Sequence, residues 1–540
     1  MSPTPSRPAS ASAASCCGST APTLNVSASS GTTATASACC GDPTPNPATG
    51  ACCSEPAATC GCQSPNAAAS GTGLHTEVTE AAPGRLPVAV IGAGPIGLAA
   101  AAHLIEKGET PIVFEAGAAV AASIREWGHV RLFSPWKYLI DPAAQRLLEA
   151  AGWSVPDPEH LPTGAELVAE LLEPLANHPT IAPHVRLDSR VIAVSRRGYD
   201  KVKSNGRDSA PFELVVRHSD SRIDRVLARA VIDASGTWNA ANPMGAGGLV
   251  AEGEAEHADR IRYGIPDVRD RERARYAGRR TLVVGSGHSA FNAILDLVSL
   301  GDEVRGTDVI WAVRRTDIGL MFGGGGKDEL EARGALGTRL EESVRNGRVR
   351  LVTGFRVARV LDAGGALVVE SDEGERLGPV DQIVVATGFR PDLSLARELR
   401  VRLDPWLEAP EPLAPLIDPN VHSCGTVYPH GAAELAHPEK DFYVVGMKSY
   451  GRAPTFLMLT GYEQVRSVAC ALVGDEEGAR NVELVLPETG VCQTDLSGVA
   501  GGCCSTGAGV GETDAAGSSC GVPERVPLQI GRKSVAAGVV

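Results

Sequence analysis

Apolar runs separated by glycine-rich turns alternate with amphipathic stretches through the middle of the chain. Leu86–Ile91 has the pattern of a buried strand, Gly97–Glu106 that of a helix, and Pro111–Phe114 that of a second strand. Together they predict one β-α-β unit. A second unit of the same kind is expected from Arg280–Val284, Ala290–Leu300 and Val309–Val313. This alternation predicts parallel sheets in an α/β fold.

Further elements lie around and between the two units. Strands are expected at Val185–Val194, Phe212–Arg217, Val226–Ile232, Val349–Val360, Ala366–Glu370, Gln382–Val385 and Tyr443–Val445. Helices are expected at Ala143–Ala151, Gly164–Leu175 and Gly461–Val473. The chain therefore has the elements of two linked α/β domains.

The two ends of the chain differ from this body in composition. Residues 1–84 are mainly Ala, Ser, Thr, Pro and Gly, and such a segment cannot bury enough apolar surface to fold, so we expect disorder. Residues 476–540 are similar apart from the apolar run Val482–Leu486. The predicted domains are residues 85–274 for the first part of one domain, 275–390 for an inserted domain and 391–475 for the return to the first.

The first β-α-β unit carries a glycine loop of the dinucleotide-binding type. Gly92-Ala-Gly94-Pro-Ile-Gly97 follows a strand and opens a helix, and Glu115 ends the next strand. Gly92 permits the tight turn, Gly94 lets a pyrophosphate approach the backbone, and Gly97 lets helix and strand pack closely. The carboxylate of Glu115 can accept hydrogen bonds from both ribose hydroxyls. The loop predicts a dinucleotide site.

The second unit repeats the loop with different chemistry. Gly285-Ser-Gly287-His-Ser-Ala290 has Ala in place of the third glycine, and its second strand ends at Arg314 and Arg315 rather than at an acid. Guanidinium groups at this position suit a 2′-phosphate and favour NADPH over NADH. The alternative is a solvated arginine pair. We interpret His288 as a turn or cap residue, and the nearby Gly323–Lys327 run as a flexible loop.

Composition and charge limit the classes of function. The chain has 540 residues and a formal net charge of −14, which does not suit a nucleic acid or an anionic membrane surface. No apolar stretch is long enough to span a bilayer, and the N-terminus lacks the apolar core of a signal peptide. We therefore expect a cytoplasmic protein with a small-molecule substrate; its oligomeric state is left open.

The two loops, together with Ala386-Thr-Gly388 and Asp233-Ala-Ser-Gly236, resemble the flavoprotein superfamily with two dinucleotide-binding domains. This resemblance implies FAD at the Gly92 loop and NADPH at the Gly285 loop, with Gly388, Gly446 and Gly461 also near the cofactors. Its disulfide reductases place a Cys-x-x-Cys or Cys-x4-Cys pair beside the flavin. The body of this chain has no such pair, which disfavours that branch.

Its flavin-containing and Baeyer–Villiger-type monooxygenases carry Phe-x-Gly-x-x-x-His-x-x-x-aromatic-Pro before the second loop. Here Gly253 and His257 keep the spacing, the Phe is absent and Tyr263 comes two residues late. The match is degenerate, and it indicates kinship with monooxygenases.

Three stretches resemble flavin monooxygenase-like proteins encoded in arsenic-resistance operons. They are Arg125-Glu-Trp-Gly-His-Val-Arg-Leu-Phe-Ser-Pro-Trp136, the second glycine loop, and Lys448–Phe456 through Gly461-Tyr-Glu-Gln464. The resemblance implies that NADPH reduces FAD, and that the reduced flavin either uses molecular oxygen or passes electrons to an acceptor. We predict Arg125, Arg131 and Trp136 near the flavin or substrate; a surface salt link and a core aromatic are the alternative.

The cysteines suggest a thiophilic target. Eight of the 14 lie in the first 62 residues and four lie after position 490. Adjacent cysteines form a strained disulfide but can both bind one soft ion, such as trivalent arsenic, mercury or zinc. The four adjacent pairs predicted to bind a soft metal or metalloid are Cys16–Cys17, Cys39–Cys40, Cys52–Cys53 and Cys503–Cys504. Random clustering in a low-complexity tail is the alternative.

Cys424 is a candidate active-site thiol or a plain buried cysteine, whereas Cys470 is expected in the core. Three functions remain open from the sequence. The first is an NADPH-dependent flavin monooxygenase acting on a soft nucleophile such as an arsenical. The second is a flavoprotein reductase or oxidase without oxygen transfer. The third is a metal-binding protein whose flavin body is vestigial.

Overall fold

The computed structural model describes residues 85–317, 321–322, 330–421, 430–454 and 456–484. The chain divides into two units, Met1–Gly73 and Leu74–Val540. All described residues belong to the second unit. The predicted tail of residues 1–84 and most of the stretch 476–540 lie outside the described residues.

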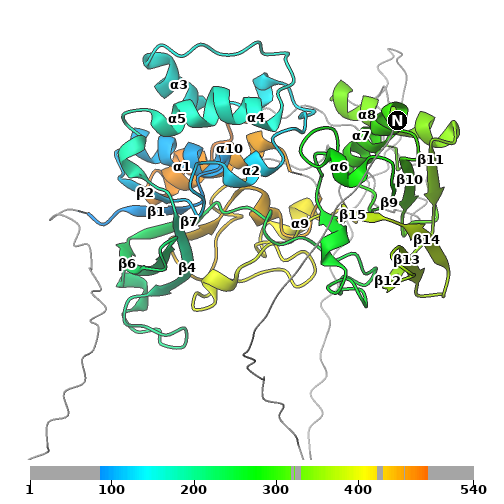
Figure 1. Cartoon of the computed structure of the whole chain (residues 1–540). Helices are drawn as coiled ribbons and strands as arrows, with labels where there is room; N and C mark the ends of the chain where they lie inside the picture. The colour runs from blue at the N-terminus through cyan, green and yellow to red at the C-terminus, as the bar shows by residue number, and fades with distance from the viewer. Residues whose placement is uncertain (1–84, 318–320, 323–329, 422–429, 455, 485–540) are drawn as a thin grey trace, which may run out of the picture. The chain divides into compact units, whose positions relative to one another are not determined.

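A five-stranded parallel sheet forms the centre of the first domain (Figure 1). Its strands, in spatial order, are β16 (Phe442–Val444), β7 (Ala230–Asp233), β1 (Val88–Ile91), β2 (Pro111–Phe114) and β3 (Val185–Arg186). One face is covered by helices α1 (Pro95–Glu106), α3 (Pro142–Ala150) and α10 (Met458–Leu472). The other face is covered by an antiparallel sheet of β4 (Ser189–Arg196), β5 (Phe212–His218) and β6 (Ile223–Ala228).

Side-chain alternation along β1 explains these layers. Val88 and Val90 belong to the core shared with the helices, whereas Ala89 and Ile91 belong to the core shared with the antiparallel sheet. Successive residues of a strand point to opposite faces, and a strand buried on both faces therefore consists only of apolar residues.

The second domain repeats the same three layers around another parallel sheet. In spatial order its strands are β11 (Val349–Val352), β10 (Asp308–Ala312), β9 (Arg280–Val284), β15 (Gln382–Val385) and β8 (Ile261–Tyr263). Helices α7 (His288–Glu303) and α8 (Glu331–Arg345) cover one face. The other face packs on antiparallel strands β12 (Val357–Asp362), β13 (Leu367–Ser371) and β14 (Arg376–Val380).

Short helical segments connect these layers. They are α2 (Ala122–Glu126), η1 (Trp136–Tyr138), α4 (Gly164–Leu167), η2 (Val168–Leu172), α5 (Glu173–Asn177), η3 (Ala182–His184), η4 (Arg207–Ser209), η5 (Ala258–Arg260), α6 (Arg273–Tyr276), η7 (Ser394–Ala396), α9 (Ala414–Ile417), η8 (Gly446–Tyr450) and α11 (Glu476–Arg480).

The structure confirms the α/β fold with parallel sheets and differs from the prediction in where strands break. Three predicted strands, Val185–Val194, Val226–Ile232 and Val349–Val360, are each two strands in different sheets. The first break lies at Asp188, whose φ of 50° turns the chain between β3 and β4. Apolar residues continue through each break because both sheets pack on shared cores, so the pattern concealed the change of sheet.

The elements that the sequence did not predict include β8, β14, α8 and α11, as well as the short helices α2, α6 and α9. Helix α11 lies in the stretch assigned to the C-terminal tail, yet it is hydrogen bonded to α10: Ser467 Oγ donates to the carbonyl of Ala479 at 2.6 Å, and Arg466 to that of Gly478 at 2.9 Å. The folded part of the chain therefore extends past residue 475.

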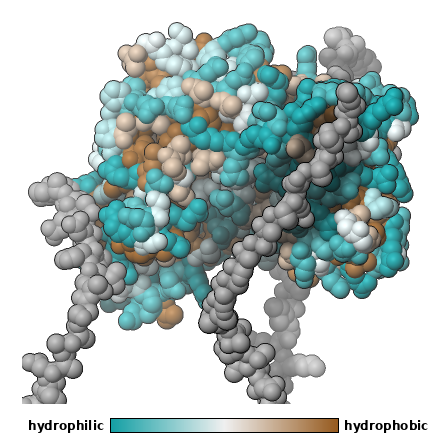
Figure 2. Space-filling view, viewed as in Figure 1, coloured by the Kyte–Doolittle hydropathy of each residue, from teal (hydrophilic) through white to brown (hydrophobic). Residues whose placement is uncertain are grey.

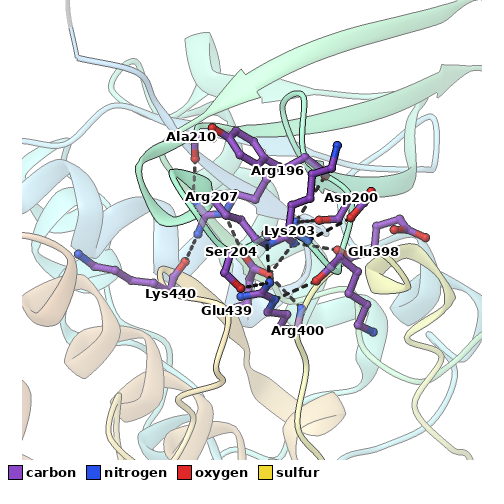
Figure 3. A network of polar contacts seen from close by, with 12 residues as sticks. Arg196, Asp200, Lys203, Ser204, Arg207, Ala210, Glu398, Arg400, Glu439 and Lys440 are labelled. Atoms are coloured by element: carbon purple, nitrogen blue, oxygen red, sulfur yellow. Dashed lines mark hydrogen bonds and ion pairs between the residues drawn. The ribbon is translucent and has the colours of Figure 1, made fainter. Parts of the chain in front are cut away.

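A buried ionic network attaches the antiparallel sheet of the first domain to the segment before β16 (Figure 3). The Glu439 carboxylate lies 2.7 Å from Arg196 Nε and 2.9 Å from Arg207, and all three side chains are buried. Burial alone would raise the pKa of Glu439, but the hydrogen bonds from both arginines lower it below its usual value. The Arg196 guanidinium also lies 3.6 Å from the centre of the Phe212 ring.

The polarity of the surface is as expected for a protein that buries most of its apolar residues in internal cores. The face drawn in Figure 2 is mostly polar, and its apolar residues gather in separate patches. None of the described helices is long and apolar enough to cross a membrane.

The buried carboxyl of Asp296 on α7 should make the stability of the protein depend on pH, which allows the packing of the second domain to be tested. Burial raises the pKa of its carboxyl from 3.8 to about 6, with Asp267 adding to the rise and Arg269 and Arg339 opposing it. Because the folded pKa lies above the unfolded one, stability falls as pH rises from 4 through 6. Asp296→Asn should remove this loss and stabilise the protein at pH 7 by up to about 3 kcal/mol.

Thermal or urea unfolding between pH 4 and 8 measures this effect. The exposed Asp270 provides the matched control, because Asp270→Asn makes the same change without relieving a buried charge. Equal pH profiles for D296N and the unsubstituted protein would contradict the assignment.

Candidate dinucleotide sites

Gly92 lies where no side chain fits. Its φ is +98°, and a Cβ there would lie 2.8 Å from the carbonyl oxygen of Ala234, which follows β7. A Cβ on Gly97 would lie 1.9 Å from the Gly92 carbonyl oxygen. These two glycines therefore serve the close packing of loop, helix and neighbouring strand.

Gly94 differs from both, because a Cβ there would meet nothing within 4 Å. It is the N-cap of α1, and no side chain caps that helix end. The first N–H groups and the positive end of the helix dipole are therefore available to an anion. The space beside Gly94 and the uncapped helix suit the pyrophosphate of a dinucleotide.

Glu115 is buried beside this loop. Its two carboxylate oxygens accept backbone hydrogen bonds from Ala93 and Gly117, both at 2.9 Å. A cavity of about 260 Å³ begins at Ala118, directly after Gly117 in the chain, and is lined by Val120, Arg125, Glu173 and neighbouring residues. In a dinucleotide-binding fold the acid after the second strand binds the ribose of adenosine. The cavity therefore suits the adenosine end of the ligand.

The second loop has the same construction with one difference. A Cβ on Gly285 would lie 2.2 Å from the carbonyl oxygen of Ala386, which follows β15, and a Cβ on Gly287 would meet nothing within 4 Å. Helix α7 also lacks a side-chain cap. Ala290 is fully buried in the second core, so this loop leaves room for a methyl group that the first loop lacks at Gly97.

Arg314 and Arg315 follow the end of β10. Arg314 is exposed, and its guanidinium lies 3.5 Å from the carbonyl of Ala246; Arg315 is half-buried, and its carbonyl accepts from Gly354 at 2.8 Å. Within the described part of the chain no carboxylate is ion-paired with either arginine. Both cations thus stand at the strand end where a 2′-phosphate would be bound.

Gly388 belongs to the junction between the domains. The Thr387 hydroxyl donates to the carbonyl of Asn242 at 2.8 Å, and the Asn242 N–H donates to the carbonyl of Gly388 at 2.9 Å. Gly388 has a φ of +85°, which glycine adopts readily. This motif joins the chain leaving β15 to the segment that follows β7.

Gly446 and Gly461 bring a third segment to the first loop. Cβ atoms on them would lie 3.2 and 2.5 Å from side-chain atoms of Ile96, the second residue of α1. Gly461 is in the first turn of α10, and α1 and α10 pack side by side (Figure 1). The ends of both helices therefore meet at the carboxyl edge of the first sheet.

The predicted catalytic residues have different surroundings. Arg125 is ion-paired with Glu173 at 2.6 Å on the rim of the adenosine-side cavity, and Arg131 donates to the carbonyl of Leu161 near Glu166. Trp136 is fully buried in the first core. The structure thus has the salt links and core aromatic that the alternative interpretation described, and a catalytic role for either arginine stays a prediction.

The degenerate monooxygenase motif has structural contacts. A Cβ on Gly253 would lie 2.1 Å from the carbonyl oxygen of Val360 on β12, so the glycine permits close strand approach. The Tyr263 hydroxyl donates to the buried Glu254 carboxylate, and burial together with this hydrogen bond raises the pKa of Tyr263. His257 precedes η5.

The predicted thiols lie mostly outside the described residues. This applies to Cys424, to the tail pairs Cys16–Cys17, Cys39–Cys40, Cys52–Cys53 and Cys503–Cys504, and to the Gly323–Lys327 run. Cys470 is described and buried in the core, as expected. Across the described ranges no group of His, Cys, Asp and Glu could hold a metal ion.

A buried polar network, which the sequence did not predict, lies behind the first glycine loop. Gln464 Oε1 accepts from the Gly446 N–H at 2.7 Å, and Gln464 Nε2 lies 2.8 Å from His430 Nε2. Lys448 is ion-paired with Asp233 at 2.7 Å. The only sequence signal was polar residues inside otherwise apolar segments, and these side chains meet only in the folded chain.

Comparison with known proteins identifies the family. The model of the pyridine nucleotide-disulphide oxidoreductase family matches residues 86–438, well over half of the chain. The chain belongs to this family. It is a flavoprotein oxidoreductase that uses a flavin and a nicotinamide cofactor, and the two open, uncapped loops fit two such dinucleotides.

Individual relatives of this oxidoreductase are distant. Flavin-containing monooxygenase 1 of Homo sapiens is 22% identical over 221 residues, which cover 40% of this chain and 39% of the human protein. The chain thus spans well under half the length of that relative. Bacillithiol disulfide reductases from Bacillus cereus and Staphylococcus aureus are 20% and 16% identical with TM-scores of 0.53 and 0.51; each match covers 73% of this chain and 100% or 99% of the reductase. These structures share the fold.

The two open glycines predict separable losses of cofactor. Gly94→Ala should weaken FAD binding at least about tenfold through a clash with the pyrophosphate, while the stability of the apoprotein changes by less than about 0.5 kcal/mol. Gly287→Ala should leave FAD bound and raise the KM for the nicotinamide cofactor. Flavin absorbance after gel filtration, thermal unfolding and steady-state kinetics measure these effects.

Gly97→Ala is the contrasting control, because its methyl group clashes with the Gly92 backbone. It should destabilise the apoprotein by about 2 kcal/mol. If G94A retains FAD as tightly as the unsubstituted protein, the pyrophosphate does not lie at Gly94.

Proposed function

We propose that this oxidoreductase is an NADPH-dependent FAD monooxygenase that acts on a soft nucleophile such as sulfur or trivalent arsenic. The proposal rests above all on the pair of uncapped helix ends with open glycines. One lies beside Glu115, and the other lies beside Arg314 and Arg315, which have no ion-paired carboxylate among the described residues. In this proposal the first domain, built around β1, binds FAD, and the second domain, built around β9, binds NADPH. The predicted boundaries of 85–274, 275–390 and 391–475 shift at two points, because β8 (Ile261–Tyr263) pairs with β15 of the second sheet and α11 (Glu476–Arg480) packs on α10 of the first domain.

The residues of each site have distinct tasks. Gly94 and the N-terminus of α1 bind the FAD pyrophosphate, Glu115 binds the ribose, and the cavity beside Arg125 takes the adenine. Gly287 and the N-terminus of α7 bind the NADPH pyrophosphate, with Arg314 and Arg315 on the 2′-phosphate. When bound, the flavin supplies the chemistry of accepting hydride and transferring electrons onward.

The uncapped α10 helix has its first turn beside Ile96 of the FAD loop. Its positive end stabilises negative charge on a neighbouring ligand. We assign this helix to the pyrimidine edge of the flavin, as the superfamily resemblance implies. The burial of Tyr450, which raises its pKa, keeps that phenol neutral near the same helix.

Two observations support oxygen transfer over disulfide reduction. The first observation is the sequence similarity to the human flavin-containing monooxygenase. The family segment, residues 86–438, contains one cysteine, Cys424, so it holds no pair that could cycle as a dithiol. A flavoprotein reductase or oxidase without oxygen transfer is the alternative outcome of the experiment below.

The cysteine tails extend the proposal to the substrate. We propose that the adjacent pairs bind trivalent arsenic or another soft ion and raise its local concentration at the flavin. A trivalent arsenical is then both the cargo of the tails and the substrate of the enzyme.

Substitution of the arginines tests the nicotinamide cofactor. Arg314→Ala with Arg315→Ala should raise the KM for NADPH at least about tenfold, because charged hydrogen bonds to the phosphate are lost, and leave the KM for NADH nearly unchanged. Arg305→Ala, also an exposed arginine of the same domain, is the control. Equal changes for both cofactors would argue against a 2′-phosphate site.

Product analysis tests the oxygenase. Purified holoenzyme with NADPH should consume oxygen and form one oxygenated product per NADPH from arsenite, a methylated trivalent arsenical or a thioether. Peroxide release in place of product would indicate an oxidase, and NADPH-dependent disulfide cleavage a reductase. Replacement of the eight paired tail cysteines by Ser should raise the KM for arsenite but not for the thioether; an unchanged KM would refute capture by the tails.

A further inference from the structure

Three chain segments leave the carboxyl edge of the first parallel sheet next to one another. β1 continues into Gly92, β7 into Ala234 and β16 into the turn at Gly446. The Ala234 N–H donates to the carbonyl of Ile91 at 2.9 Å, and the Val445 N–H donates to that of Asp233 at 3.0 Å. A dinucleotide on the N-terminus of α1 is therefore bordered by all three segments.

Lys448 crosses from the third of these segments to the second. Its ammonium lies 2.7 Å from Asp233 Oδ2 and 3.0 Å from Ser235 Oγ. The side chains of Lys448 and Asp233 are 2% and 0% exposed. The other Asp233 oxygen accepts from the Ser235 hydroxyl at 2.6 Å and from its N–H at 3.1 Å. The ion pair thus fixes η8 to the end of β7.

The same turn is fixed on its other side by α10. Ser449 Oγ donates to the carbonyl of Gly446 at 2.8 Å and accepts from Gln464 at 2.9 Å. Gln464 also binds the Gly446 N–H. The turn therefore has little freedom as long as both attachments hold, and Gly446 stays against Ile96 of the glycine loop.

The opposite charges of Lys448 and Asp233 have a second consequence. A buried ion pair is tolerated because each charge compensates the other, and removal of one partner leaves an uncompensated charge in a medium that solvates it poorly. Without Lys448 the carboxylate of Asp233 would act on a ligand whose diphosphate is negative and whose flavin gains negative charge on reduction.

We propose that Lys448 is a positioning residue for FAD. Its ion pair with Asp233 holds the Gly446–Tyr450 turn in place and keeps the floor of the FAD site electrically neutral. The proposal rests on the proposed function only in taking FAD as the dinucleotide at Gly92.

The experiment compares Lys448→Met with Lys440→Met, the same change at an exposed lysine. The Kd of the apoprotein for FAD, measured by flavin fluorescence, should rise at least about tenfold for K448M and stay unchanged for K440M. In the double variant D233N/K448M, which has no uncompensated charge, part of the affinity should return.

The midpoint potential of the bound FAD separates an electrostatic effect from general loosening. With saturating FAD, K448M leaves a net negative charge and should lower the potential, whereas Asp233→Asn leaves a net positive charge and should raise it. The double variant should return close to the unsubstituted value. Opposite signs follow from charge and would not follow from packing damage alone.

Two results would overturn the proposal: an FAD Kd for K448M equal to that of K440M, or potentials of K448M and D233N that shift in the same direction. If K448M does not fold, Ser235→Ala takes its place; it removes one acceptor of Lys448 and one donor to Asp233 but keeps both charges, and it should raise the Kd about threefold. Failure of the unsubstituted apoprotein to bind FAD would instead refute the proposed function.

Discussion

At the carboxyl edge of each parallel sheet, the first glycine of a nucleotide loop lies directly against the backbone that leaves the neighbouring strand. The gap at Gly92 beside Ala234 admits no Cβ, and neither does the gap at Gly285 beside Ala386. This contact sets where α1 and α7 begin. It thereby sets where their uncapped N-termini point.

The two domains have the same arrangement of layers but carry different charged residues after their strands. Each has a parallel sheet between helices and a small antiparallel sheet, and each central strand alternates its side chains between two cores. The charged residues next to the two glycine loops differ at the ends of the neighbouring strands. Glu115 follows the strand next to the first loop, whereas Arg314 and Arg315 follow the strand next to the second loop, and this difference is the basis for proposing different nucleotides at the two loops.

Buried charge in the first domain is compensated by partners from distant parts of the sequence. Glu439 is neutralised by Arg196 and Arg207, and Asp233 by Lys448. Both sets attach segments after residue 430 to elements that lie much earlier in the sequence. The first domain is discontinuous in sequence, and these ion pairs join its two parts.

The sequence by itself determined the two β-α-β units, the glycine loops and the acid or arginines after them, because these depend on local periodicity and on backbone needs within about 30 residues. Only the tertiary structure decided which apolar runs break between sheets, as at Asp188, and which polar residues meet, as Lys448 and Asp233 do across 215 residues. The periodicity of apolar residues indicates which side chains are buried but not which residues they contact. The role of a buried charged side chain can be inferred only when its ion-pair partner is known.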